Sequence, residues 1–143
     1  MRRNLVFFLL IGVSAGLLAA CSSGGAGPAA AGTKTQVGPT AANAVENYLQ
    51  GVVSKDVDKV STLSCKEWEQ DAIQELDSLQ AVKAALSGVV CTQSGTDGST
   101  SLVNCTGKIV ITYDNENQEL DLSLRTYRVT QSGGDWQVCG YQQ

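Results

Sequence analysis

The sequence predicts an α+β domain in which three helices precede a four-stranded antiparallel sheet. Up to Gly88, the apolar residues recur every three or four positions, as they do on one face of a helix. Beyond Gly88, apolar and β-branched residues form short runs that are separated by loops rich in Gly, Asn and Asp. Helices followed by a run of strands are typical of the α+β class, and a chain of 143 residues has room for one such domain.

The first 20 residues have the pattern of a signal peptide. Positive Arg2 and Arg3 precede an apolar run of 14 residues, from Leu5 to Leu18. A helix needs about 20 apolar residues to cross the hydrocarbon core of a membrane. The run is therefore too short for a transmembrane anchor and matches the apolar region of a signal peptide.

The apolar run ends in Leu18-Ala19-Ala20-Cys21, which resembles the lipobox of bacterial lipoproteins. The resemblance implies cleavage before Cys21 and a lipid on its sulfur, with acyl chains such as palmitate that hold the protein on the outer face of the cytoplasmic membrane. Two or more acyl chains give stable anchoring. In an organism with two membranes, Ser22 in the next position implies the outer membrane. The alternative is an ordinary signal peptide in which Cys21 has no special role.

Residues 21–39 are expected to form a flexible tether, and residues 40–143 are expected to form the folded domain. The tether is rich in Gly and Ala and has few large side chains, so it buries too little apolar surface to fold. Removal of Arg2 and Arg3 with the signal peptide changes the net charge from −4 to −6, and no cluster of Lys and Arg remains. This charge argues against nucleic acid as a partner.

The composition argues against an enzyme, a cofactor or a metal centre. The chain contains no histidine, which is the commonest general base and a frequent zinc ligand. The four cysteines of the domain include no close pair of the kind that zinc sites use. Among the tyrosines only Tyr113 is expected to point inward, with its hydroxyl in water rather than in an acid–base role. We therefore predict no catalytic residue and no metal ligand.

Polar residues mark the ends of the three predicted helices. Thr40 is expected to cap a helix over residues 41–53, and Asp56 is expected to cap a second, short helix that ends near Cys65. A third helix is expected from Lys66 to Ser87, where Gly88 would stop it.

Four strands are expected at residues 89–92, 102–114, 119–131 and 136–141. Centring the first and third hairpins on their turns pairs Cys91 with Cys105 and places Val129 opposite Val138. The middle hairpin, with residues 115–118 as its turn, gathers six large side chains on one face by pairing Tyr113 with Leu120, Ile111 with Leu122 and Ile109 with Leu124. In this register, Cys139 points toward the helices together with Cys91 and Cys105.

Residues 40–143 resemble the NTF2-like, or cystatin-like, α+β fold in its small lipoprotein form. The resemblance is carried by the helix pair in "AANAVENYLQGVVSKDVDKVSTLSC", by the strand meander and by the ending "GGDWQVCGYQ". It implies a curved sheet wrapped around the helices, a cone that often encloses a pocket. Some members of the family are enzymes, and many only bind ligands or dimerise.

Disulfides are expected between Cys91 and Cys105 and between Cys65 and Cys139. An even set of cysteines in an exported domain is typical of disulfide bonding. In a meander, the strands of Cys105 and Cys139 are two positions apart, about 9.6 Å, which exceeds the roughly 7 Å that a disulfide can bridge between α-carbons. Cys91 and Cys139 are farther apart still, so one pairing survives.

The predicted function is a non-catalytic interaction module at the cell envelope. The strand registers place Tyr127, Val129, Trp136 and Val138, with Val110, on the sheet face away from the helices, where they would form an interface with a second copy or another envelope protein. The alternative is a bulge near Arg125 and Thr126 that turns Val129, Trp136 and Val138 inward as part of the core. The alternative function is a module that binds a small apolar ligand in the pocket of the cone.

Overall fold

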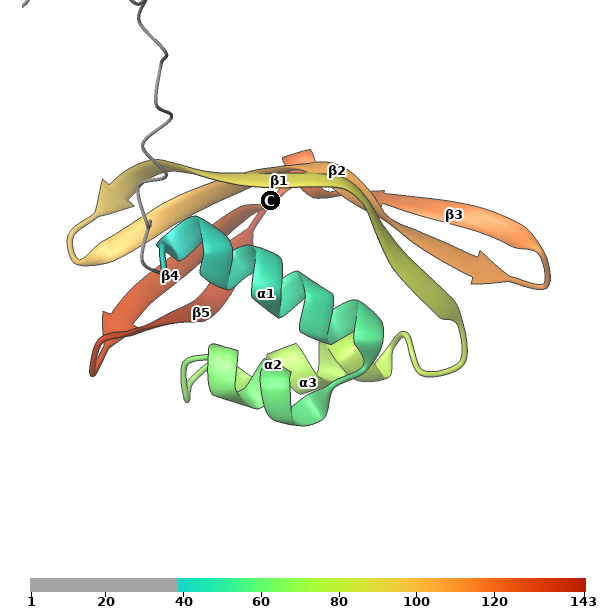
Figure 1. Cartoon of the computed structure of the whole chain (residues 1–143), viewed down its shortest axis with the longest axis horizontal. Coiled ribbons are helices and arrows are strands. Elements are labelled where there is room, and N and C mark those ends of the chain that lie inside the picture. The colour runs from blue at the N-terminus through green and yellow to red at the C-terminus, as the bar shows by residue number, and fades with distance from the viewer. Residues whose placement is uncertain (1–38) are drawn as a thin grey trace, which may run out of the picture. The chain divides into compact units, whose positions relative to one another are not determined.

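The computed structural model describes residues 39–143, and the predictions for Cys21, for the signal peptide and for most of the tether lie outside these residues. The described chain forms three helices and then a sheet: α1 (Ala41–Ser54), α2 (Val57–Leu63), α3 (Glu69–Asp77), β1 (Lys83–Asp97), β2 (Thr100–Tyr113), β3 (Glu116–Asp121), the 3-10 helix η1 (Leu122–Leu124), β4 (Thr126–Ser132) and β5 (Asp135–Gln142). The three helices lie on one side of a bent antiparallel sheet (Figure 1).

The two predicted helix caps are confirmed. The Thr40 hydroxyl oxygen accepts a hydrogen bond from the backbone N–H of Asn43 at 3.1 Å. The Asp56 carboxylate accepts one from the backbone N–H of Lys59 at 3.0 Å. Each cap satisfies an N–H group that the first turn of the helix cannot pair.

The third helix is shorter than the sequence predicts. It ends at Asp77 rather than at Ser87, and the chain enters β1 at Lys83. The apolar residues Val82, Ala84 and Leu86, which pack against the core, also alternate as a strand requires. β2 is long, and pairing of Lys83 with Thr112 lets β1 follow it almost to its end. Tertiary pairing thus overrides the helical spacing of this segment.

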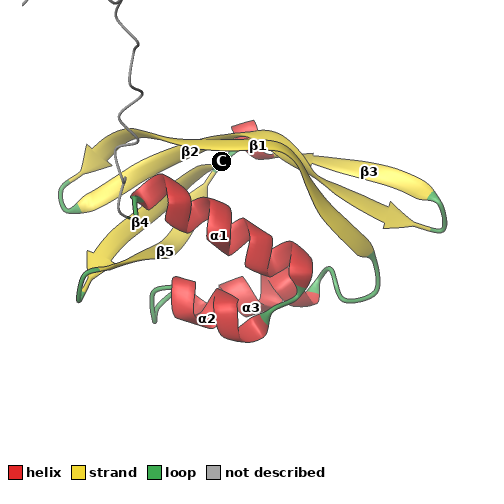
Figure 2. Ribbon diagram, viewed as in Figure 1, coloured by secondary structure: helices red, strands yellow, loops and turns green. Residues whose placement is uncertain are grey.

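The predicted four-stranded meander is wrong, because the sheet has five strands. β1 pairs with one side of β2, while β4 pairs with the first part of its other side and β3 with the last part (Figure 2). The strand expected at 119–131 is therefore two strands. Between them the Asp121 carboxylate accepts a hydrogen bond from the Ser123 N–H at 2.8 Å and starts the 3-10 turn η1.

The middle hairpin has a tighter turn than predicted. Asp114 and Asn115 have φ values of 48° and 68°, as the two central residues of a type I′ turn require. The two-residue turn pairs Ile109 with Leu120, four residues away from the predicted partner Leu124. The expected turn of four residues, 115–118, is wrong because Asn at the second central position favours the short turn.

The predicted interface residues lie largely in the core. Tyr127, Val129 and Val138 have exposed fractions of 0%, and Trp136 is partly buried. The 3-10 turn reverses the alternation of faces between β3 and β4, so Tyr127 and Val129 face the helices. The irregularity is at residues 122–124, close to the bulge considered as the alternative, and it removes the predicted exposed patch.

Two disulfides join the predicted pairs, Cys91 with Cys105 and Cys65 with Cys139. Cys91 and Cys105 are directly opposite each other on β1 and β2. The segment before α3 runs beside β5, where the Cys65 N–H donates to the Val138 carbonyl at 2.8 Å. Cys139 does not point toward the helices as predicted: its sulfur lies 3.1 Å from the Thr130 hydroxyl, whereas neighbouring Val138 faces the core.

Candidate functional site

A cleft of about 310 Å³ lies between α3 and the end of the sheet that carries β3. Its apolar lining comes from α1, the turn after α3, β2 and β3, through Val52, Leu79, Ile109 and Leu120. Its main charged groups are Glu75 of α3 and Arg125, which precedes β4. The cleft thus combines apolar walls with a small number of polar groups, the usual make-up of a ligand site.

Local structure explains why Glu75 and Arg125 meet. α3 buries Ala72 and Leu76 against the core, which leaves Glu75 at the edge of the buried stripe. Arg125 closes η1 by donating its backbone N–H to the Leu122 carbonyl at 3.1 Å. The 3-10 turn therefore directs Arg125 across the end of the sheet toward α3.

The two charged groups form a mostly buried ion pair. Nη1 of Arg125 lies 2.6 Å from Oε1 of Glu75, and the side chains are 11% and 16% exposed. Oε2 of the same carboxylate accepts the hydroxyl of Tyr48 at 2.8 Å. Both carboxylate oxygens are therefore occupied, as a buried carboxylate requires.

Aromatic rings surround the ion pair. The Arg125 guanidinium lies 4.2 Å from the centre of the Tyr141 ring, a cation–π contact. Tyr141 in turn packs edge-on against Trp68 at 5.7 Å and lies 5.6 Å from Tyr127. Gly140 makes this packing feasible, since a β-carbon there would approach the Trp68 ring to 3.3 Å and its φ of 118° disfavours other residues.

Burial keeps the tyrosines of the cluster protonated. Burial raises the pKa of Tyr127 to about 12, against a lowering by nearby Arg125. Burial also raises the pKa of Tyr48 and of Tyr141, and the negative charge of Glu75 adds to both shifts. Burial opposes the charge of Arg125, yet Tyr127 and Glu75 hold its pKa above the usual value. The three hydroxyls therefore stay protonated at higher pH than that of an exposed tyrosine, beside the Arg125–Glu75 ion pair.

The Tyr127 hydroxyl makes no hydrogen bond of good geometry among residues 39–143, although its side chain is fully buried and the Arg125 guanidinium lies close to it. Buried polar groups without a partner are uncommon and cost free energy. The cleft region thus contains an unpaired buried hydroxyl in addition to the buried Arg125–Glu75 ion pair.

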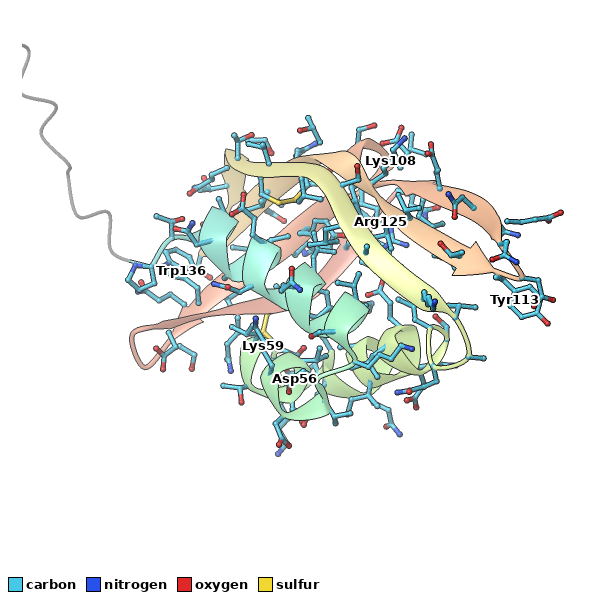
Figure 3. All side chains as sticks on the ribbon, turned by 45° about the vertical axis from the view of Figure 1, so that its right-hand side comes forward. Asp56, Lys59, Lys108, Tyr113, Arg125 and Trp136 are labelled. Carbon is cyan, nitrogen blue, oxygen red and sulfur yellow. A yellow bond between two sulfur atoms is a disulfide. The ribbon has the colours of Figure 1, made fainter. Side chains whose placement is uncertain are left out.

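The structure separates the residues that the sequence singles out. Tyr113 is 60% exposed at the tip of the β2–β3 hairpin, at the opposite end of the domain from Trp136 (Figure 3). Trp136 lines a second groove, of about 370 Å³, with Pro39 and Leu63, and its indole N–H donates to the Pro39 carbonyl at 2.9 Å. Neither residue belongs to the cleft.

Sequence reasoning missed Glu75 and Arg125. In the sequence, Glu75 is one of several acidic residues within the predicted third helix, and Arg125 lies inside the strand predicted at 119–131. A single Arg beside a run of apolar residues is a weak signal, because only the fold shows which carboxylate lies opposite it.

Two further observations concern the described part of the chain. Within residues 39–143, no helix is long and apolar enough to cross a membrane. In that same part of the chain, no group of three or more Cys, Asp or Glu side chains is placed to hold a metal ion.

Comparison with known proteins identifies no family. No protein-family model matches the chain, and no curated protein matches it either. A SEC-C motif-containing protein from Rhodopseudomonas palustris is similar in structure with a TM-score of 0.48 and 12% identity, over 73% of this chain and 80% of that one. The helical cell-shape-determining protein of Campylobacter jejuni gives 0.48 and 9%, over 70% of this chain and 38% of its own length. Likeness of this degree carries no functional conclusion.

Proposed function

We propose that the chain is a lipid-anchored extracytoplasmic protein whose domain binds a small ligand in the cleft between α3 and β3. The anchor is supported by the Leu18-Ala19-Ala20-Cys21 sequence and by the cysteines. Both disulfides lie within residues 39–143, and such bonds persist in oxidising compartments outside the cytoplasm. Cys21 is the one cysteine of the chain that these bonds do not use.

The cleft carries the ligand-binding part of the proposal. Its mostly buried ion pair lies in a cleft lined by apolar side chains, of which Leu120 is 40% exposed while Val52, Leu79 and Ile109 are nearly fully buried. The interface expected around Val129 and Val138 loses its basis, because those side chains fill the core. Binding therefore replaces self-association as the function that the geometry favours.

The anchor is tested with Cys21→Ser in the producing bacterium. We expect wild type to appear in the membrane fraction and to incorporate labelled palmitate, and the variant to lose both properties. A variant that stays lipidated and membrane-bound contradicts the anchor.

The cleft is tested with octanol as an apolar probe and the lipid-free chain, residues 22–143. Leu120→Glu places a charge in the cleft and should abolish saturable binding in a calorimetric or NMR titration. Leu124→Glu is the matched control, because Leu124 is 68% exposed and does not line the cleft. Equal binding by both variants, or no binding by wild type, contradicts the proposal.

A protein partner on the β2–β3 hairpin is the second candidate function. All six residues of β3 are exposed, and within residues 39–143 β3 pairs with β2 alone, which leaves its outer edge open to another strand. Exposed Tyr113 lies at the tip. Sedimentation of wild type and Tyr113→Ser tests the simplest partner, a second copy; a wild type that remains monomeric excludes it.

A further inference from the structure

We infer that the ligand of the cleft is a small amphiphile with a carboxylate head and an apolar body, and that Arg125 recognises the head. The inference rests on the proposed function of the cleft as a ligand site. It adds the chemical class of the ligand and the residue that selects it.

Arg125 has hydrogen-bond donors to spare. A guanidinium carries five N–H groups in a planar fork. Among residues 39–143, the Arg125 side chain donates from Nη1 to Glu75 and lies close to the Tyr127 hydroxyl, which leaves other N–H groups of the guanidinium without a protein acceptor. One face of the guanidinium is covered by Tyr141, and the side chain lines the cleft while being 11% exposed. A carboxylate that accepts two parallel hydrogen bonds matches the remaining edge of such a fork.

Glu75 offers little to a cationic head. Its Oε1 accepts from Arg125 and its Oε2 accepts from Tyr48. An ammonium would therefore compete with two existing donors and would lie next to the guanidinium charge. Asp71 also lines the cleft, but it is exposed, so water and salt screen its charge. Because Arg125 offers free N–H donors and Glu75 offers no free oxygen, the cleft favours a ligand head group that accepts hydrogen bonds.

The walls of the cleft fit a short apolar body. Leu79 and Ile109 line the cleft but are nearly fully buried, so the accessible apolar surface comes mainly from Leu120, which is 40% exposed. A volume of about 310 Å³ is at the low end of the range for ligand sites, so a long acyl chain would extend beyond it. An eight-carbon chain is a suitable probe.

Three probes that differ only in the head group test the inference on the lipid-free chain, residues 22–143. Octanoate, octanol and octylamine are titrated separately, and the backbone amide signal of Leu120 is followed by NMR. We expect octanoate to bind about tenfold more tightly than octanol, because hydrogen bonds to a charged group are the stronger kind. Octylamine should bind most weakly.

Two arginine variants show whether Arg125 makes the selection. Arg125→Lys keeps the positive charge and loses the fork, so it should weaken octanoate binding about tenfold and leave octanol binding unchanged. Arg128→Lys is the matched control, since Arg128 pairs with Asp97 on the surface of β4. Near-ultraviolet circular dichroism of both variants checks that they fold.

The outcomes distinguish a failure of the carboxylate head from a failure of the cleft as a ligand site. Octanol or octylamine binding as tightly as octanoate overturns the carboxylate head and leaves the cleft as a ligand site. The same is true if Arg125→Lys binds octanoate like wild type. If none of the three probes shifts the Leu120 signal, the proposed function of the cleft fails as well.

Discussion

The two halves of the sheet differ in how completely they are closed, although the same strand, β2, runs through both. In the closed half, made of β4, β5 and the first part of β2, Val103, Tyr127, Val129 and Val138 are fully buried. The Cys65–Cys139 disulfide ties β5 of this half to the segment before α3, and the Cys91–Cys105 disulfide ties β2 to β1. In the open half, made of β3 and the last part of β2, every residue of β3 is exposed and Leu120 borders the cleft.

The difference teaches that the short turn η1 separates a closed half, whose side chains enter the core, from an open half that borders the cleft. Before it, the side chains of β3 that share a face with Ile109 cover only the rim of the core. After it, Tyr127 and Val129 enter the core directly opposite Val103 and Ser101. Arg125 stands at the junction, where it can reach both α3 and the cleft.

The largest expected effect comes from opening the closed half. Cys65 and Cys139 are separated by 74 residues in sequence, and on the chain-entropy model a loop of that size contributes about 4.5 kcal/mol. The double variant Cys65→Ser/Cys139→Ser should lose about this free energy of unfolding in urea denaturation. Cys91→Ser/Cys105→Ser should lose less, about 3 kcal/mol, because its loop is shorter. The reverse order would contradict this account of the closed half.

The ion pair at the junction comes next. Glu75→Ala leaves the mostly buried Arg125 charge without a partner, so we expect a loss of about 3–5 kcal/mol in the free energy of unfolding. Asp97→Ala removes the carboxylate partner of Arg128, but that pair is exposed, and the loss should stay below about 1 kcal/mol. Thermal or urea unfolding of both variants checks the contrast, and equal losses would show that the pair is not buried.

Alkaline pH should weaken the aromatic cluster. The pKa of Tyr127 is about 12 in the folded protein and 10.0 without burial. The unfolded chain thus loses this proton first, and the associated stability is complete below about pH 10 and is lost as pH rises toward 12. The slope is about 1.4 kcal/mol per pH unit for one proton. Melting temperatures between pH 9 and 12 should fall less steeply in Tyr127→Phe than in wild type; parallel curves would contradict the burial of this hydroxyl.

The smallest expected effects are those of removing the hydroxyls of two buried tyrosines, and the change in the free energy of unfolding should differ in sign or size between them. Tyr48→Phe removes a hydroxyl that donates to Glu75, so the free energy of unfolding should fall by about 1.5–3 kcal/mol. Tyr127→Phe removes a hydroxyl without a partner in the described chain, so at neutral pH its stability should equal or slightly exceed that of wild type. Denaturant titrations of both proteins provide the comparison. A large loss for Tyr127→Phe would reveal a partner for its hydroxyl.

Local signals in the sequence were sufficient for features that depend on neighbouring residues. The caps at Thr40 and Asp56 follow from side chains that bond to backbone groups three residues away. The opposition of Cys91 and Cys105 follows from a hairpin centred near Gly98. These interactions span few residues, so the sequence alone determines them.

The sequence-based prediction of the fold was wrong where contacts between distant residues determine the secondary structure. Residues 83–87 satisfy a helical and an extended pattern equally, and only the length of β2 selects the strand. The break at Leu122–Leu124 is held by hydrogen bonds from the Ser123 N–H to Asp121 and from the Arg125 N–H to Leu122, and neither has a clear signature in the sequence. Because that break sets the faces of Tyr127 and Val129, the predicted interface failed with it. The Glu75–Arg125 pair joins residues 50 positions apart and was invisible for the same reason.

The central claim is that the open half is the ligand site and the closed half its scaffold. An NMR titration of the uniformly ¹⁵N-labelled chain, residues 22–143, with octanoate tests it most directly. We predict saturable shifts of the backbone amides of Glu75, Ile109, Leu120 and Arg125, with Cys91, Cys105 and Cys139 unchanged. Shifts centred instead on Trp136 and Leu63, in the groove at the opposite end of the domain, or an absence of saturable shifts, would contradict the claim.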